Sequence, residues 1–305
     1  MSKLACVFPG QGSQSVGMLA ELAKDFSLVK TVFEEASDAL GYDVWNVTQS
    51  DDGRLNQTEI TQPVLLTAGI ACLSVLRAET EFTPDFYAGH SLGEYTALVA
   101  TNVIGLGAGV KLVQARGQFM QQAVAPSDGA MYAIIGLDDD TIATVCAKIA
   151  AQTKQVVSPV NYNSPGQVVI AGSKAATDAA AVALKEAGAK RALPLPISVP
   201  CHCALMKGAG EKLETLLSAI QFKPATAPIV NNVDVVVNDN VDKIKEALVR
   251  QIYLPVRWSE SVQYLIAQGV TEIVEVGPGK VLTGLTRRID KSVATRKMNS
   301  PEDIQ

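Results

Sequence analysis

The stretch Phe86-Tyr-Ala-Gly89-His-Ser91-Leu-Gly93-Glu94 decides the fold, because it joins a short apolar strand to a helix through a turn with glycine on both sides of a serine. This Gly-x-Ser-x-Gly arrangement between a strand and a helix is the nucleophile-elbow pattern. The turn is so tight that side chains two residues before and after Ser91 would collide, so only glycine fits. The helix that follows begins with backbone N–H groups, among them that of Leu92, which can stabilise an oxyanion. We predict that Ser91 is a nucleophile; the alternative is a glycine-rich turn that only connects two elements.

Outward from this turn, apolar periodicity divides the chain into a large and a small α/β unit. Strands are expected at 4–8, 86–88, 229–233 and 272–276, with helices at 16–40, 60–77, 95–99, 107–124, 241–253, 259–268 and after 279. Between them, 130–137, 139–151, 156–162, 167–171, 174–187 and 191–197 follow the order strand, helix, strand, strand, helix, strand. That order is typical of the ferredoxin-like split unit. We therefore predict an α/β fold: a large α/β-hydrolase-like domain with a parallel sheet, residues 1–126 and 199–305, and an inserted small ferredoxin-like subdomain, residues 127–198.

Composition and charge narrow the class of protein. With 305 residues, 48% of them hydrophobic, the chain can bury the core of one large unit or two small ones. Its net charge of −5 argues against a nucleic-acid partner, which needs a basic face. The apolar stretch at 64–76 is shorter than a membrane span, and the one that Pro9 ends is too short for a signal-peptide core. Five cysteines, an odd number, do not suit a disulfide framework. We therefore expect a cytoplasmic protein without nucleic-acid or membrane partners. We also predict a monomer, although composition does not determine the oligomeric state.

A serine hydroxyl needs a base, and the chain contains only two histidines. His90 is adjacent to Ser91, so the two side chains diverge and His90 cannot easily reach the hydroxyl. His202 follows a proline-stiffened connection, 194–200, that leaves the small unit, and it is the candidate base; the alternative is a loop histidine without a role. Its neighbours Cys201 and Cys203 could bind zinc, but a structural zinc needs four ligands and the sequence has no second Cys/His pair. We predict no metal.

Arg116 is the most informative charge, because it lies within the apolar stripe of the helix at 107–124. A buried guanidinium must be paired. Its partner is either a carboxylate of the protein, with Glu94 as a candidate, or a free carboxylate that arrives with the substrate and is held by two hydrogen bonds. Gln11 follows the first strand, at the sheet edge where ligands of open α/β sheets bind.

Seven motifs occur in an order that resembles a known family. They are Phe8-Pro-Gly-Gln-Gly-Ser-Gln14, Thr61-Gln-Pro63, Gly89-His-Ser-Leu-Gly-Glu94, Gln114-Ala-Arg-Gly117, Val160-Asn-Tyr-Asn163, Val199-Pro-Cys-His-Cys203 and Glu275-Val-Gly-Pro-Gly279. Together they resemble the bacterial malonyl-CoA:acyl carrier protein transacylases of fatty acid synthesis, from about residue 3 to residue 290. The sequence departs from the family at Cys201, where a small hydroxyl residue or alanine is commoner.

The resemblance implies a ping-pong acyltransferase whose substrates are malonyl-CoA and holo acyl carrier protein, with no cofactor. Ser91 would attack the malonyl thioester with His202 as general base, and the phosphopantetheine thiol would then take the malonyl group. By the same resemblance, Arg116 grips the malonyl carboxylate. The implied remaining roles are an oxyanion hole from the N–H groups of Gln11 and Leu92, a main-chain carbonyl of Gln251 that orients the histidine, and supporting positions for Gln62 and Asn161. Leu92 is also similar to the residue found in malonyl-selective members.

Three other interpretations share parts of this pattern. An esterase or thioesterase of the α/β-hydrolase type has the same elbow, but needs an acidic residue to orient the base. A non-catalytic docking module for carrier proteins would keep the fold but would not need Ser91, His202 and Arg116 together. A polyketide acyltransferase differs in its acceptor rather than in its chemistry. Since carrier proteins of this kind are acidic, we hypothesise a local basic patch at the mouth of the site, with Lys190, Arg191, Lys280, Arg287 or Arg288 as its candidates.

Overall fold

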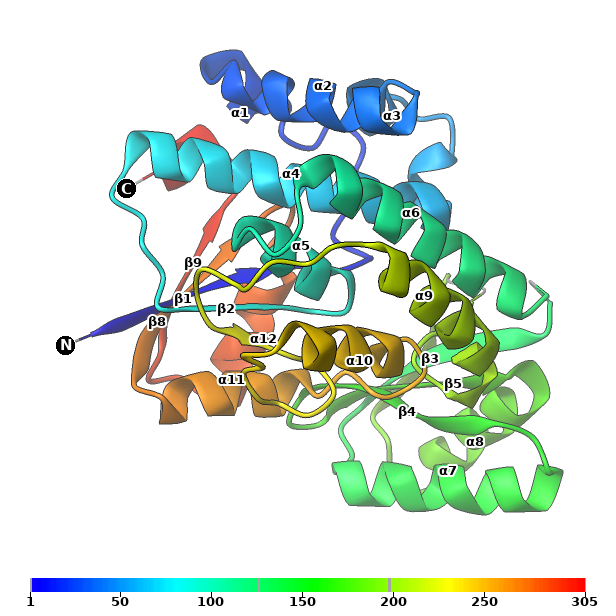
Figure 1. Ribbon diagram of the computed structural model, residues 1–305. Coiled ribbons are helices and arrows are strands. Elements are labelled where there is room, and N and C mark those ends of the chain that lie inside the picture. Colours follow the sequence, from blue (N-terminus) through cyan, green and yellow to red (C-terminus); the bar gives the residue numbers. More distant parts are fainter. Residues whose placement is uncertain (1, 126, 197–198, 305) are drawn as a thin grey trace.

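In the part of the chain that the structure describes, the larger sheet consists of five parallel strands. The computed structural model describes residues 2–125, 127–196 and 199–304. Within these, the strand order is β7-β2-β1-β8-β9 (Figure 1). The strands are β1 (Lys3–Phe8), β2 (Phe86–Gly89), β7 (Ile229–Val230), β8 (Val270–Val276) and β9 (Ala294–Met298). Phe8 at the end of β1 pairs with Gly89 at the end of β2, so the segments that begin with Pro9 and with His90 leave the sheet side by side.

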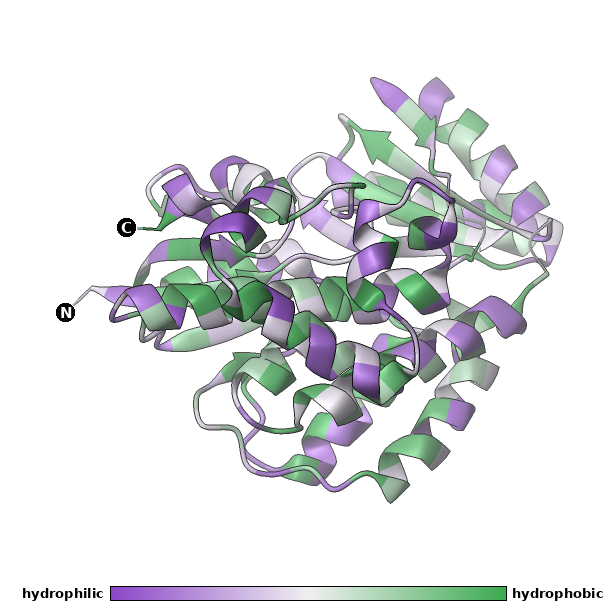
Figure 2. Ribbon diagram, turned by 90° about the horizontal axis from the view of Figure 1, so that it is seen from above, coloured by the Kyte–Doolittle hydropathy of each residue, from purple (hydrophilic) through white to green (hydrophobic). Residues whose placement is uncertain are grey.

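Helices cover both faces of this sheet. Successive side chains of a strand point to opposite faces, and β1 shows this directly: Cys6 and Phe8 belong to one apolar core, Ala5 and Val7 to the other. Figure 1 shows the first face covered by α4, α5 and α6, with α2 packed on the outer side of α4 and α6, and the second face covered by α11 and α12. These helices are α2 (Leu28–Leu40), α4 (Thr58–Glu79), α5 (Leu92–Ala100), α6 (Leu106–Ala123), α11 (Trp258–Ala267) and α12 (Val281–Ile289). The outer helices carry polar and apolar residues along their length (Figure 2), as expected of helices that bury one face.

A second, antiparallel sheet has the strand order β4-β5-β3-β6. Its elements follow one another as β3 (Gly129–Ile135), α7 (Asp139–Thr153), β4 (Val157–Ser164), β5 (Gln167–Ser173), α8 (Lys174–Glu186) and β6 (Arg191–Pro194). One face packs against α7 and α8 in a core of its own. Met131 and Val169 point to the other face and join the core of the large sheet. The second sheet therefore forms one wall of the space above the carboxyl ends of β1 and β2.

Helix α4 is long and apolar enough to cross a membrane by length and composition. It exceeds the apolar stretch that the sequence indicated, because Thr58 to Pro63 and Arg77 to Glu79 are also helical. However, 78% of its most apolar window is buried inside the protein, where α2, α5 and α6 pack against it. It is the central helix of the larger core.

Several predicted bounds are corrected by the structure. The single helix expected at 16–40 is two helices, α1 (Ala20–Asp25) and α2, because Phe26 is extended and Ser27 starts a new helix. The helix expected from residue 60 already begins at Thr58, so Pro63 lies inside it rather than in its first turn. Six elements of the described residues were not predicted: α3 (Val44–Gln49), α9 (Lys207–Ala219), β9 and three short 3-10 helices at Arg54–Asn56, Ala204–Met206 and Pro301–Asp303.

The inserted unit was predicted to span residues 127–198; residue 126, just before it, and residue 198, its last, both lie outside the described residues. The strand expected at 191–197 ends at Pro194 in the structure, and residue 197 again lies outside the described part. Helix α10 (Val241–Gln251) ends two residues earlier than expected, with Gln251 as its last residue.

Candidate active site

The turn between β2 and α5 holds Ser91 in a strained backbone conformation. Its φ of 53° and ψ of −104° lie in a region that side-chain-bearing residues rarely adopt. A Cβ on Gly89 would lie 1.9 Å from the carbonyl carbon of Gly93, and a Cβ on Gly93 would lie 2.0 Å from the Phe8 carbonyl oxygen. The prediction that only glycine fits at these two positions is confirmed.

His202 lies against Ser91, although 110 residues separate them in the chain. The Ser91 Oγ is 2.8 Å from His202 Nε2, and His202 Nδ1 is 2.6 Å from the main-chain oxygen of Gln251. A carbonyl can only accept, so Nδ1 carries the proton and Nε2 is left as the acceptor for the serine hydroxyl. An esterase of the hydrolase type would have a carboxylate where this carbonyl lies.

Burial fixes the protonation state of this histidine. His202 is 4% exposed. Desolvation, and secondarily the positive charge of Arg116, lower the pKa of His202 to about 3. At neutral pH the imidazole is therefore uncharged and able to accept a proton.

Arg116, on α6, is 1% exposed and points at Ser91. Its NH1 donates to Gln62 Oε1 at 2.8 Å, and its NH2 donates to Gln251 Oε1 at 2.9 Å and to Ser91 Oγ at 3.2 Å. No carboxylate of the described residues forms a salt bridge with it, and its Nε has no hydrogen-bond partner there. The Glu94 carboxylate, one of the two partners considered from the sequence, bonds to other groups. A buried cation held only by neutral oxygens is suited to receive an anion from outside.

These side chains surround a cavity of about 70 Å³ at the carboxyl end of the large sheet. Its lining includes seven of the eight residues proposed from the sequence: Gln11, Gln62, Ser91, Leu92, Arg116, Asn161 and His202. The eighth, Gln251, lies behind Ser91 and Arg116. The cavity shares Gln11, His90, Met131 and Asn161 with a groove of about 230 Å³ between the two sheets. A long substrate can therefore reach the serine along this groove.

The second histidine is used elsewhere. His90 Nε2 lies 2.8 Å from Asn163 Oδ1 on β4, and its ring lies near that of Trp258. Burial lowers the pKa of His90, so it is a neutral structural link between the two sheets rather than a base.

Sequence reasoning missed Asn232, which is fully buried beside the elbow. Its Oδ1 accepts from the Ser91 N–H at 2.7 Å, and its Nδ2 donates to the Gly89 carbonyl at 2.7 Å. One side chain thus holds the backbone of the turn on both sides of His90. The available signal was a pair of asparagines directly after β7, at the same edge of the sheet as Ser91.

Cys201 and Cys203 are buried free thiols. Their sulfur atoms donate to the carbonyls of Val199 and Pro200. Among the described residues, no group of three or more His, Cys, Asp or Glu side chains is arranged to hold a metal.

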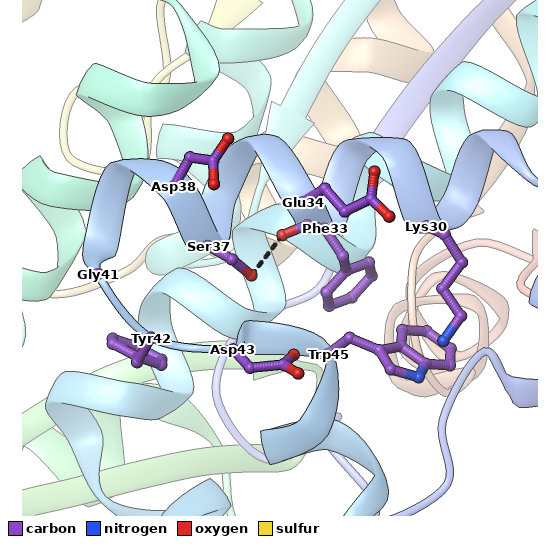
Figure 3. Close-up of a pocket in the computed structure, with 9 residues that line it drawn as sticks. All are labelled: Lys30, Phe33, Glu34, Ser37, Asp38, Gly41, Tyr42, Asp43 and Trp45. Carbon is purple, nitrogen blue, oxygen red and sulfur yellow. Dashed lines mark hydrogen bonds between the residues drawn. The ribbon is translucent and has the colours of Figure 1, made fainter.

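A larger pocket of about 610 Å³ lies between α2 and α3, and none of the proposed site residues lines it (Figure 3). Lys30 Nζ already covers the Trp45 ring at 3.6 Å from its centroid, and the Ser37 hydroxyl donates to Phe33 O. The remaining polar groups are the carboxylates of Glu34, Asp38 and Asp43 and the buried Tyr42 hydroxyl, which has no hydrogen-bond partner among the described residues. We assign this pocket no role.

Comparison with known proteins defines the class first. The profile of the acyl transferase domain family matches residues 5–300, and the chain belongs to this family. Within it, the chain is similar to proteins named malonyl CoA-acyl carrier protein transacylase. It is 56% identical to the one of Escherichia coli (strain K12), over 99% of this chain and 97% of that one, and 43% identical to that of Bacillus subtilis (strain 168), over 100% and 96%. The resemblance drawn from the motifs is confirmed.

Solved structures agree with this assignment. An acyl carrier protein S-malonyltransferase from Vibrio cholerae superposes with a TM-score of 0.96 at 55% identity, covering 99% of this chain and 98% of that one. A malonyl-transacylase solved in complex with a type II PKS acyl-carrier protein superposes with a TM-score of 0.97 at 51% identity, with the same coverage.

Proposed function

We propose that this chain transfers the malonyl group of malonyl-CoA to the phosphopantetheine thiol of an acyl carrier protein, through an ester on Ser91, and so supplies extender units for fatty acid biosynthesis. The observation that carries the proposal is a buried Arg116 that has no carboxylate partner among the described residues and lies 3.2 Å from the candidate nucleophile. The names of the relatives support malonyl-CoA as donor and a carrier protein as acceptor.

In the first half-reaction, Ser91 gives its proton to His202 Nε2 as its oxygen attacks the thioester carbonyl. The negative charge on the carbonyl oxygen falls to the N–H groups of Leu92 and Gln11. The N–H groups of Gly93 and Glu94 are already bonded to carbonyls of the turn, whereas those of Leu92 and Gln11 have no acceptor in the described part of the chain. When the tetrahedral intermediate collapses, the C–S bond breaks and the His202 proton goes to the coenzyme A sulfur.

The second half-reaction reverses these steps with a different thiol. His202 accepts the proton of the phosphopantetheine thiol, whose sulfur attacks the malonyl-serine ester. The C–O bond to Ser91 breaks, and the proton returns to its oxygen. In both half-reactions, Arg116 is the clamp that binds the malonyl carboxylate, and Gln62 supports it by a hydrogen bond. Gln251 orients His202 through its main-chain carbonyl, and Asn161 forms part of the cavity wall.

We assign the architecture to a large α/β-hydrolase-like domain with an inserted ferredoxin-like subdomain, divided near the predicted residues 126 and 198. The support is the β-α-β-β-α-β sequence from β3 to β6 and the antiparallel order β4-β5-β3-β6. We further propose a cytoplasmic monomer that needs no cofactor; five free thiols agree with a reducing compartment.

The test is a transfer assay with malonyl-CoA, the purified chain and holo or apo carrier protein. Transfer predicts malonyl-carrier protein and stoichiometric free coenzyme A with the holo form only. If the chain releases coenzyme A and free malonate when no carrier protein is present, it is instead a thioesterase. Running fatty-acid and polyketide carrier proteins side by side identifies the acceptor, and a strong preference for the polyketide protein would contradict the assigned pathway.

A further inference from the structure

A layer of buried polar groups lies directly behind Ser91 and Arg116, and the reaction as described uses only part of it. It consists of Glu94 on α5, Asn232 after β7 and Gln251 at the end of α10. Glu94 is 3% exposed and the other two are fully buried. Burying a carboxylate there costs free energy of folding unless hydrogen bonds compensate for the lost water.

Both partners of Glu94 converge on one oxygen. Its Oε2 accepts from the Asn232 main-chain N–H at 2.9 Å and from Gln251 Nε2 at 2.9 Å. Glu94 therefore contacts the residue that holds the elbow and the residue that contacts both Arg116 and His202.

Glu94 and the Ser91 carbonyl, both acceptors, together determine which way the Gln251 amide faces. Gln251 Nε2 donates to Glu94 and also to the Ser91 carbonyl at 2.9 Å. Its Oε1 is then left facing Arg116, from which it accepts at 2.9 Å. In the opposite orientation, an NH₂ group would face the guanidinium, and an oxygen would face two acceptors. An ionised carboxylate can only accept, so it excludes that orientation.

Glu94 also compensates the positive charge of Arg116 without occupying the guanidinium nitrogens. Glu94 places a carboxylate one amide group away from the guanidinium, so it attracts Arg116 but does not bond to it. A direct salt bridge would have occupied the nitrogen atoms that a substrate carboxylate needs.

We propose that Glu94 is a positioning residue for the malonyl clamp: it fixes the Gln251 amide so that its oxygen holds Arg116 ready for the substrate carboxylate. The proposal rests on the proposed function, and it makes Glu94 a determinant of selectivity for acyl groups that carry a free carboxylate. Acyl groups without one do not use the clamp, so they depend on Glu94 much less.

The experiment compares acylation of Ser91 by malonyl-CoA and by acetyl-CoA in single turnovers followed by intact-protein mass spectrometry. In Glu94→Ala, the malonyl rate is expected to fall about tenfold more than the acetyl rate, the size expected for one lost hydrogen bond to a charged group. Glu94→Gln keeps an oxygen but loses the charge and the fixed orientation, so we expect about a threefold shift of the ratio.

Glu275→Gln is the matched control. Glu275 is also buried, at the end of β8, where it accepts from the N–H groups of Leu282 and Thr283 at the start of α12. Its neutralisation should lower stability and leave the malonyl-to-acetyl ratio unchanged.

Equal losses with both donors, or no loss with either, in the Glu94 variants would overturn the proposal, because a residue needed only for folding lowers both rates alike. If Glu94→Ala does not fold, the ratio in Glu94→Gln decides. Failure of the wild type to form a malonyl adduct would instead refute the proposed function itself.

Discussion

At the residue scale, the chemistry depends on a histidine oriented by a main-chain carbonyl rather than by a carboxylate. No carboxylate of the described residues bonds to His202, and burial and the charge of Arg116 keep it neutral, with its pKa lowered to about 3. The unfolded chain binds a proton at this histidine below about pH 6.5 and the folded one does not, so this group lowers stability as the pH falls below that value.

The rate of Ser91 acylation should therefore show no loss attributable to His202 between pH 5 and pH 7. Burial raises the pKa of Glu94 to about 7, although the hydrogen bonds from Gln251 and Asn232 act in the opposite direction. An inflection of the pH–rate curve in this range therefore belongs to Glu94. The measurement is acylation by malonyl-CoA from about pH 5 to 8 in wild type and Glu94→Gln. A tenfold fall per pH unit below about 6.5 that persists in Glu94→Gln would show that His202 titrates normally.

Arg116→Ala should reduce acylation by malonyl-CoA about tenfold to a hundredfold more than acylation by acetyl-CoA, because the substrate carboxylate loses its partner. Arg116→Lys keeps the charge without the planar fork and should lie between. Arg250→Ala is the control: Arg250 precedes Gln251 and pairs with Asp234 at the surface. Equal losses of acylation rate with both donors in Arg116→Ala would contradict the proposal that Arg116 binds the substrate carboxylate.

At the scale of elements, the strand–turn–helix unit requires that α5 pack directly on the end of β1. Gly93 is the point of closest approach, and the Phe8 carbonyl it meets belongs to the central strand, which cannot move. The local sequence was sufficient to predict this unit, because Gly-x-Ser-x-Gly stands between an apolar strand and a helix, and that context indicates the tight turn.

Gly93→Ala should destabilise the protein by about 2–3 kcal/mol or prevent folding, since its Cβ would lie 2.0 Å from Phe8 O. Gly107→Ala on α6 is the matched control, because its nearest neighbour would be the Ala39 Cβ at an ordinary 3.5 Å. There a gain of up to about 1 kcal/mol is expected from helix propensity. Urea unfolding measures both, and similar effects at the two sites would contradict the packing argument.

Other elements were harder to predict, for physical reasons. The break at Phe26 interrupts a continuous apolar pattern without a proline or glycine, so only packing reveals it. Helix α9 has many polar residues and buries only a narrow stripe, which includes Leu213 and Leu217. Asn232 could not be linked to Ser91 from the sequence, because its role depends on β7 lying beside β2.

At the scale of the whole molecule, the site lies where the antiparallel sheet closes over the carboxyl edge of the parallel one. The sequence motifs predicted the site residues themselves, but the groove between the sheets emerges only from the fold. Its rim brings part of the hypothesised basic patch to the mouth: Lys280 precedes the lining residue Val281, and Arg288 donates to Gln167, which also lines the groove.

Lys280→Glu and Arg288→Glu should therefore raise the KM for holo carrier protein several-fold at low salt, with little change for malonyl-CoA. The difference from wild type should shrink at high salt, because screening weakens exposed charge pairs. Lys24→Glu, on α1, is the control for a change in net charge alone. An unchanged carrier-protein KM across the salt series would show that docking occurs elsewhere.

The central claim is covalent transfer through Ser91, and intact-protein mass spectrometry after mixing with malonyl-CoA tests it most directly. We predict one malonyl adduct on the wild-type chain, none on Ser91→Ala, and loss of the adduct when holo carrier protein is added. An adduct that survives in Ser91→Ala, or one that holo carrier protein cannot remove, would contradict the account.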